Sequence, residues 1–350
     1  MPRSYLVVGG AGFLGSHIVQ ALVARGNSAV AVYDVKTPVD EDRVAGVEYF
    51  IGDIIDEVRL VEVLNKAQVD LLFHAASPVH GLDDSLYFKV NQHGTEKVLS
   101  ACREAKVTKL VYTSSTGVVW TGATFNGIDE LKAKMPAQGY DAYHHTKAIA
   151  EKLVLAANDE SDNFQAVVLR PCGMTGERDS QLIWRLAKVL NDGQQNVQIG
   201  DNSNLVDYLY AGNAADAHVL AAERLFDAPL TVAGEVFFIT NGSPMRQWDF
   251  SRMVWRELGD DGSKTAIVIP RSIGLILATL AELWCRITGT KTEFNRFSVR
   301  YVTATQWYNI DKAKKLLGYE PKVSLEEGVR RTANWWKEVG STRHARERHS

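Results

Sequence analysis

The stretch VVGGAGFLGSH, residues 7–17, constrains the fold more than any other part of the chain. It places Gly9, Gly12 and Gly15 where a short apolar run ends and a helical pattern begins. At such a junction glycines allow a tight turn, let backbone N–H groups approach a pyrophosphate, and let the helix pack closely on the strand. About 20 residues later, an acid, Asp34, closes the next apolar run. The pattern predicts a dinucleotide-binding turn at the start of a parallel sheet.

Short β-branched runs alternate with amphipathic helical patterns from Tyr5 to about Lys152. Apolar strands separated by such helices are typical of a parallel sheet that is covered on both faces. We therefore expect an α/β fold with a doubly wound parallel sheet, the Rossmann arrangement. The expected division is a dinucleotide-binding domain at 1–171 with a returning strand near 235–241, a smaller and discontinuous C-terminal substrate-binding region at 172–234 and 242–338, and a disordered tail at 339–350.

Composition and charge argue against several classes of protein. The 350 residues are 45% hydrophobic with a formal net charge of -3, and they lack the concentrated basic face of a nucleic-acid-binding protein. Cys102, Cys172 and Cys285 are far apart and have no CxxC spacing, which suggests neither a disulfide framework nor a zinc site. The N-terminus lacks the pattern of a signal peptide, so we expect a cytoplasmic protein without nucleic-acid partners.

The segment IGLILATLAEL, residues 273–283, is the strongest membrane candidate but is too short to span a bilayer. Two interpretations fit it. It is either a buried helix of the substrate-binding region or an interfacial helix that contacts lipid. The second interpretation implies peripheral contact with a membrane, and for a cytoplasmic protein we expect this to be the endoplasmic reticulum membrane.

Several strand ends are candidates for binding the dinucleotide. The Asp34 carboxylate can accept hydrogen bonds from both hydroxyls of an adenosine ribose and would repel a 2′-phosphate, which favours NAD over NADP, although Lys36 lies two residues further on. Asp53 and Ile54 end the next strand pattern, and Ala75 and Ala76 are small enough for close approach. The predicted cofactor residues at this end are Gly9, Gly12, Phe13, Leu14, Gly15, Asp34, Asp53, Ile54, Ala75 and Ala76.

The stretch DAYHHTKAIAEK, residues 141–152, contains two candidate pairs. Tyr143 and Lys147 are four residues apart and share one face of a helix, whereas His144 and His145 are neighbours and diverge by about 100°. Adjacent histidines cannot form the i, i+4 metal site of a helix, so no metal is predicted. A phenol is a poor base at neutral pH unless a nearby cation stabilises its phenolate, and Lys147 is placed to help. Tyr143 and Lys147 are therefore the predicted catalytic pair.

A hydroxyl donor is also needed to orient the substrate oxygen. The strand end VYTSSTG offers Thr113, Ser114 and Ser115, of which Ser115 is our choice. The alternative is that these hydroxyl groups only close the strand.

With these motifs the chain resembles the extended short-chain dehydrogenase/reductases from about residue 4 to 338. Within them it is most similar to the 3β-hydroxysteroid dehydrogenase branch, and in particular to the fungal decarboxylating sterol-4α-carboxylate 3-dehydrogenases. The narrower likeness rests on stretches such as YTSSTGVVW, AYHHTKAIAEKLVL, LRPCGMTGERDSQLI and LVDYLYAGNAADAHVLAA. The resemblance implies a triad of Ser115, Tyr143 and Lys147, in which Tyr143 and Lys147 also contact the cofactor. It further implies Asn91 as a helix-stabilising or cofactor-side residue, and Pro171, Cys172 and Gly173 beside the nicotinamide.

The resemblance implies NAD-dependent oxidation of a 3β-hydroxyl on an apolar sterol or triterpenoid 4α-carboxylate, followed by loss of carbon dioxide. The first alternative is a 3β-hydroxysteroid or triterpenoid dehydrogenase of secondary metabolism that does not decarboxylate. The second is a non-catalytic dinucleotide sensor, which would not need Ser115, Tyr143 and Lys147 together. Trp248, residues 273–283, Trp284 and Phe294 are candidates to line an apolar mouth, and we expect a homodimer.

Overall fold

A computed structural model describes residues 3–158, 163–179, 181–290 and 292–347. Its centre is a seven-stranded sheet in the order β12-β7-β5-β4-β1-β2-β3, in which every neighbouring pair is parallel. The strands are β1 (Ser4–Val8), β2 (Ala29–Asp34), β3 (Glu48–Ile51), β4 (Leu71–His74), β5 (Lys109–Thr113), β7 (Gln165–Pro171) and β12 (Val236–Ile239). The predicted doubly wound α/β fold is confirmed.

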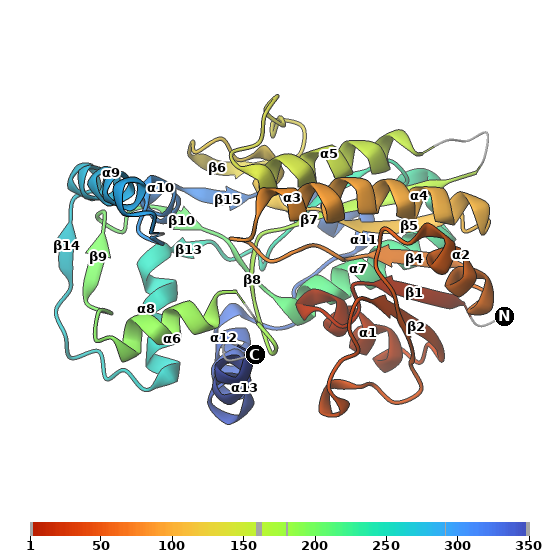
Figure 1. The fold of residues 1–350 in the computed structure, drawn as a ribbon, viewed down its shortest axis with the longest axis horizontal. Helices are drawn as coiled ribbons and strands as arrows, with labels where there is room; N and C mark the ends of the chain where they lie inside the picture. The colour runs from red at the N-terminus through yellow and green to blue at the C-terminus, as the bar shows by residue number, and fades with distance from the viewer. Residues whose placement is uncertain (1–2, 159–162, 180, 291, 348–350) are drawn as a thin grey trace.

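Helices cover both faces of this sheet (Figure 1). Side chains on β1 alternate between two buried clusters: Val7 packs with α1 (Phe13–Ala24) and α7 (Ala211–Asp227), whereas Leu6 and Val8 pack with α2 (Glu57–Lys66), α4 (Gly94–Glu104) and α5 (Ala142–Ala156). Burial on both faces is the reason why the strands are almost wholly apolar. Because these strands are parallel, the carboxyl ends of β1, β2, β4 and β5 lie at the same edge of the sheet.

Helix α7 lies in a segment that we expected in the substrate-binding region, but it packs on the sheet beside α1. Its buried face is rich in alanine, including Ala214, Ala217 and Ala221. Such small side chains let a helix approach the sheet closely. The expected boundary is wrong for this segment, because the buried alanine face of α7 packs on the central sheet.

Most of the remaining elements gather at the end of the sheet opposite the N-terminus (Figure 1). A four-stranded sheet in the order β13-β10-β15-β6 joins segments that are far apart in the sequence. The strands of this part are β6 (Phe125–Ile128), β8 (Gly173–Thr175), β9 (Val197–Ile199), β10 (Leu205–Val206), β11 (Tyr208–Tyr210), β13 (Met245–Arg246), β14 (Ile267–Ile269) and β15 (Gln306–Tyr308). Further helices are α3 (Asp84–Tyr87), α6 (Ile183–Asn191), α8 (Gln247–Leu258), α9 (Arg271–Thr288), α10 (Arg296–Thr303), α11 (Asp311–Leu317) and α12 (Leu325–Trp335).

The C-terminal tail is helical where the structure describes it, not disordered as expected. A helical turn at Trp336–Gly340 continues into α13 (Ser341–Glu347), and residues 348–350 lie outside the described part. The His344 ring stacks on Trp184 at 5.1 Å and contacts Trp336 at 5.9 Å, and Arg343 pairs with Asp42. The polar sequence of the tail does not reveal these contacts, because their partners lie elsewhere in the chain.

Helix α9 contains the predicted segment 273–283 and exposes its apolar face. Trp284 is 66% exposed, Leu280 57% and Ile287 73%, whereas only Gly274 and Ala278 of this helix are buried. The interpretation of a buried helix is therefore wrong. Among the described residues, no helix is both long enough and apolar enough to cross a membrane.

Candidate active site

The glycine turn between β1 and α1 requires glycine for steric reasons. Gly9 has a φ of 83°, in the left-handed region, and a Cβ there would lie 2.6 Å from the backbone nitrogen of Ala76. A Cβ on Gly15 would lie 2.0 Å from the carbonyl oxygen of Gly9. Gly12 is the N-cap of α1 and offers no side-chain acceptor, so the first N–H groups of the helix, those of Phe13 and Leu14 among them, have no side-chain cap. Such a helix end suits a phosphate.

Asp34, at the end of β2, lies against this turn. Its Oδ2 accepts a hydrogen bond from the Ala11 N–H at 3.0 Å, and its Oδ1 accepts one from the Lys36 N–H at 3.4 Å. Burial raises the pKa of Asp34 above its usual value, while these N–H groups act in the opposite direction. The predicted acid and the predicted turn are therefore in direct contact.

The other strand-end candidates surround the same place. Ala75 donates its N–H to the Val8 carbonyl at 2.9 Å, and Ala76 lies against Gly9. Asp53 forms an ion pair with Lys89 at 2.9 Å, and Ile54 is buried against Gly94. An uncapped helix end, glycines with no room for a Cβ, and an acid at the next strand end together fit a bound dinucleotide.

Helix α5 carries the predicted catalytic pair. It begins after Asp141, whose Oδ1 accepts the His144 N–H at 2.9 Å as an N-cap. The Lys147 side chain is 2% exposed, and its ammonium donates to the Thr113 carbonyl at 2.5 Å. Burial lowers the pKa of Lys147 to about 7, and the charge of Glu151 raises it. The ammonium therefore has a pKa near neutrality.

The three hydroxyl groups at the end of β5 have different partners. Thr113 donates to Nε2 of the buried His218 at 2.8 Å, because the His218 Nδ1–H is already given to the Ala214 carbonyl. Ser114 donates to Glu151 at 2.5 Å. Ser115 accepts from the Gly117 N–H at 3.1 Å, and as a hydrogen-bond donor it lowers the pKa of Tyr143. Of these three hydroxyls, the one that faces Tyr143 is Ser115.

The pKa of the Tyr143 phenol is too high for it to act as a base at neutral pH. Burial raises its pKa to about 12, which outweighs the hydrogen bond from Ser115. A positive charge nearby is needed to favour the phenolate at neutral pH. The Lys147 ammonium, four residues further along the same helix, can supply part of it.

The two histidines of α5 are held separately, as their adjacency predicts. His145 accepts the Gly139 N–H at 3.2 Å, whereas Nδ1 of His144 lies 2.7 Å from Oδ1 of Asp141. Sequence reasoning missed His80, whose Nε2 lies 2.9 Å from the other oxygen of Asp141. The ligand atoms of His80, Asp141 and His144 all lie within 4.8 Å of one another. Each carboxylate oxygen already has a histidine nitrogen at hydrogen-bond distance, so the group is complete as a hydrogen-bonded cluster.

Three more predicted residues lie beside these elements. Asn91 is buried, donates to the Thr146 hydroxyl of α5 at 3.0 Å, and its Oδ1 has no partner among the described residues. This contact supports α5 and fits the helix-stabilising role. Pro171 ends β7 beside Ile239 of β12, and Gly173 begins β8.

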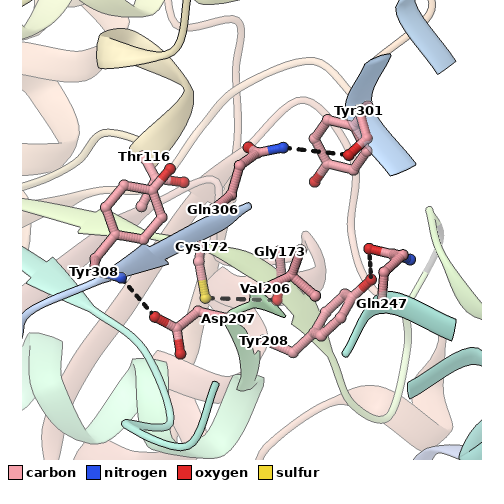
Figure 2. Close-up of a pocket in the computed structure, with 10 residues that line it drawn as sticks. All are labelled: Thr116, Cys172, Gly173, Val206, Asp207, Tyr208, Gln247, Tyr301, Gln306 and Tyr308. Atoms are coloured by element: carbon pink, nitrogen blue, oxygen red, sulfur yellow. Dashed lines mark hydrogen bonds between the residues drawn. The ribbon is translucent and has the colours of Figure 1, made fainter. Parts of the chain in front are cut away.

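A small polar cavity opens next to these residues (Figure 2). Its volume of about 20 Å³ is enough for a single water molecule. Oδ2 of Asp207 accepts the Tyr308 N–H at 2.8 Å, and Tyr208 donates to Gln247 at 3.1 Å. Burial raises the pKa of Asp207 to about 7. The lining residues are Thr116, Cys172, Gly173, Val206, Asp207, Tyr208, Gln247, Tyr301, Gln306 and Tyr308.

An aromatic wall adjoins the catalytic tyrosine. Phe297 and Tyr301 of α10 contact Trp120 at ring distances of 5.5 and 5.7 Å, and Tyr140 lies 4.7 Å from Trp120. His80 stacks on Phe297 at 5.8 Å and meets Tyr143 edge-on at 5.3 Å.

The aromatic residues proposed from the sequence for this mouth lie elsewhere. Trp284 is on the outer face of α9, Trp248 donates to the Ile199 carbonyl at 2.9 Å, and Phe294 precedes α10. Composition could not tell these aromatic residues apart.

Sequence reasoning also missed a buried ion pair, Glu151 with Arg170, beside Lys147. A signal was present, because Glu151 follows Lys147 by the same four residues that separate Lys147 from Tyr143.

Comparison with known proteins agrees with this site. The model of the 3-beta hydroxysteroid dehydrogenase/isomerase family matches residues 6–271. The chain belongs to this family. The family match covers the glycine turn, the end of β5 and helix α5, so every predicted catalytic residue lies inside it.

Several relatives that match over nearly their full length share one name. The chain is 40% identical to the decarboxylating sterol-4-alpha-carboxylate 3-dehydrogenase of Saccharomyces cerevisiae, over 96% of this chain and 98% of the relative. It is 37% identical to the decarboxylating sterol-4-alpha-carboxylate 3-dehydrogenase of Mus musculus, over 93% and 89%. Among solved structures, gox2253 has a TM-score of 0.78 at 24% identity, covering 97% of this chain and 99% of that one. The UDP-glucose 4-epimerase of Thermus thermophilus in complex with NAD has a TM-score of 0.71, also at 24% identity, over 96% and 100%. The likeness to these structures shows the fold alone.

Proposed function

We propose that this member of the 3-beta hydroxysteroid dehydrogenase/isomerase family oxidises the 3β-hydroxyl of a sterol or triterpenoid 4α-carboxylate with NAD, and that the product then loses carbon dioxide. The observation that carries the proposal is the placement of Ser115 and the buried Tyr143 together, with Ser115 lowering the pKa of Tyr143, at the strand edge that also bears the glycine turn. The names of the relatives from Saccharomyces cerevisiae and Mus musculus support the choice of substrate.

In the proposed mechanism, Ser115 holds the substrate hydroxyl and Tyr143, as its phenolate, takes the hydroxyl proton. Lys147 keeps a positive charge on the same helix face, fixed by its bond to the Thr113 carbonyl. When bound, NAD supplies the hydride acceptor. Together with Tyr143 and Lys147, the cofactor would be held by the glycine turn with Phe13 and Leu14, by the carboxylate of Asp34, and by residues next to the strands and on the helix before α4: Asp53, Ile54, Ala75, Ala76, Asn91, Pro171 and Gly173.

Decarboxylation needs no further residue. Oxidation at carbon 3 makes the substrate a β-keto acid, and the new carbonyl can accept the electron pair of the breaking carbon–carbon bond as an enolate. Ser115 and Tyr143 would hold the oxygen that gains this charge. The aromatic wall of Trp120, Phe297 and Tyr301 would face a flat apolar ring system.

A substrate panel tests the proposal. Matched 3β-hydroxysteroids with and without the 4α-carboxyl group are incubated with NAD, and the products are analysed by mass spectrometry. We expect the carboxylated member to give a 3-ketone that is lighter by carbon dioxide. If ketones form only from substrates without the carboxylate, the enzyme is the non-decarboxylating dehydrogenase. If NADH never forms, the dinucleotide-sensor alternative holds.

We also propose that α9 lies on a lipid bilayer, the source of such a substrate. Seven large apolar residues follow one another at helical spacing on its outer face: Ile273, Ile276, Leu277, Leu280, Leu283, Trp284 and Ile287. Arg271 and Arg286 add positive charge, and the single acid of the helix, Glu282, is paired with Arg296 at 2.7 Å. The helix suits an anionic lipid surface.

The membrane proposal also connects α9 with the site. Gly274 of α9 lies against Val299 of α10, and α10 supplies Phe297 and Tyr301 to the aromatic wall. A docked α9 would place the substrate mouth one helix away from the lipid. The expected location is the cytoplasmic side of the endoplasmic reticulum membrane, which localisation of a tagged chain would test. The homodimer stays a prediction, and analytical ultracentrifugation, which measures the mass of the particle in solution, would test it.

A further inference from the structure

A buried ion pair beside the catalytic residues has no part in the proposed reaction. Glu151 of α5 is 0% exposed and Arg170 of β7 is 4% exposed. The Arg170 Nε lies 3.2 and 3.1 Å from the two carboxylate oxygens, and Nη2 lies 2.5 Å from Oε1. Burying two charges is costly, and apolar residues of similar size are often at least as stabilising. The pair therefore calls for a reason other than stability.

The position of Glu151 supplies one. Glu151 follows Lys147 by one helical turn, so the two side chains share a face of α5. Consecutive residues of the β5 end bind both of them: the Thr113 carbonyl accepts from Lys147 at 2.5 Å, and the Ser114 hydroxyl donates to Glu151 at 2.5 Å. The next residue, Ser115, faces Tyr143. One carboxylate thus joins the two elements that carry the proposed catalytic residues, α5 and the end of β5, to β7.

The charges of the pair act on Lys147 in opposite directions. The negative charge of Glu151 raises the pKa of Lys147, against the lowering by burial. The guanidinium of Arg170 neutralises that carboxylate and so weakens its effect. Two other titratable groups face Lys147: the Tyr112 ring lies 4.5 Å from the ammonium, and burial together with the Lys147 charge lowers the pKa of His74 to about 3, which keeps His74 neutral. The charge on Lys147 therefore depends on both members of the ion pair.

We propose that the Glu151–Arg170 pair is a positioning group that sets the charge of Lys147 and, through it, the fraction of Tyr143 present as phenolate. The inference rests on the proposed catalytic roles of Tyr143 and Lys147. Ser114 and Arg170 fix the Glu151 carboxylate by hydrogen bonds, and the negative charge of that carboxylate favours the protonated form of Lys147.

The pH dependence of kcat reports this charge. On the acid side, activity appears when the Tyr143–Lys147 pair loses its first proton, and the active part of that singly deprotonated pair carries the ammonium and the phenolate. A nearby negative charge favours retention of that proton. Removing the negative charge therefore moves the acid limb of the kcat–pH profile to lower pH. Removal of a nearby positive charge moves the limb to higher pH. A pair with a structural role alone would move the limb in neither direction.

The test uses Glu151→Gln and Arg170→Met in the full chain with NAD and a 3β-hydroxysteroid that the wild-type chain oxidises. We expect Glu151→Gln to move the acid limb down by about one pH unit and Arg170→Met to move it up by a similar amount. Glu151→Gln should also lower the plateau of kcat about tenfold, because less of the ammonium–phenolate form is present. The double variant Glu151→Gln/Arg170→Met should return the limb toward its wild-type position. If one single variant does not fold, the shift of the other tests the inference.

A second measurement is independent of turnover. Carbon-13 NMR of Cε-labelled lysine, with the Lys147 signal assigned by Lys147→Met, should show its titration midpoint moving in the same two directions. Asp216→Asn, which removes the carboxylate that pairs with Arg25 between α1 and α7, is the matched control. It should change stability and leave the Lys147 midpoint in place.

Unchanged Lys147 midpoints and unchanged acid limbs in both single variants, or in the one that folds, would overturn the inference. Failure of the proposed function has a different signature, because Tyr143→Phe would then keep its turnover. If Tyr143→Phe is inactive and the Glu151 and Arg170 variants do not shift, the proposed reaction stands and the pair is structural.

Discussion

The carboxyl edge of the sheet and helix α9 depart from the usual distribution of residues in opposite ways. At the sheet edge, Lys147, Glu151 and Arg170 are buried, although charged side chains are rarely buried unless paired. On α9, Leu280 and Trp284 are more than half exposed. The first departure needs hydrogen bonds at every buried charge and marks a site for chemistry. The second leaves an apolar stripe without a partner in the described chain and marks a surface for contact.

The contrast between the sheet edge and α9 depends first on whether the buried polar groups of the sheet edge catalyse the reaction. Replacing Tyr143 by Phe should lower kcat about a thousandfold while NAD affinity hardly changes, because the phenol acts on the substrate. NADH formation and calorimetric titration with NAD measure the two quantities. Tyr140→Phe, in the neighbouring aromatic wall, keeps its ring and should keep most activity. Substantial turnover by Tyr143→Phe would remove the base from the mechanism.

Replacing an apolar residue by serine should destabilise the protein more in the buried core beside the sheet than on the exposed face of α9. Val154 of α5 is fully buried in the core, so Val154→Ser should lower the free energy of unfolding by about 3 kcal/mol through lost packing and a buried hydroxyl. Leu280→Ser on α9 should change it by less than about 0.5 kcal/mol. Urea denaturation measures both. Equal losses would mean that α9 is packed in solution, for instance against a second copy of the chain.

Variants of Asp34 test whether the negative charge at this strand end decides between NAD and NADP. Asp34→Ala should change the NAD to NADP ratio of kcat/KM at least about tenfold toward NADP, since repulsion of a 2′-phosphate is lost. Asp34→Asn, which can still accept the Ala11 N–H, separates charge from hydrogen bonding and should move the ratio in the same direction. A constant ratio in both variants would place the ribose elsewhere.

The smallest effect is expected on membrane contact. Trp284→Glu should weaken binding to vesicles of phosphatidylcholine and phosphatidylserine about tenfold in a flotation assay, because a charge replaces an apolar anchor. Leu230→Glu is the control, since Leu230 is equally apolar and 89% exposed but lies in the turn after α7. Equal binding by all three chains would remove the lipid from the proposal, and the stripe on α9 would need another partner.

Local rules were enough to find much of the site. The left-handed φ of Gly9 and the missing space beside Gly15 concern neighbouring residues, so the glycine pattern alone could reveal the turn. The four-residue spacing of Tyr143 and Lys147 fixes a shared helix face in any α-helix. The same rule would have found Glu151, had it been applied once more.

Other features depended on contacts between distant segments. His80 meets Asp141 across 61 positions in the sequence, and the tail helix α13 is held by Trp184. Whether α9 faces inward or outward is likewise undecided by its apolar pattern, because core and lipid select the same residues. The glycine turn, the parallel sheet and the shared helix face of Tyr143 and Lys147 were determined by the sequence, since each follows from backbone geometry or helical periodicity. The burial of Glu151 with Arg170, the aromatic wall and the exposure of α9 were decided only by the tertiary structure, since each depends on which distant surfaces meet.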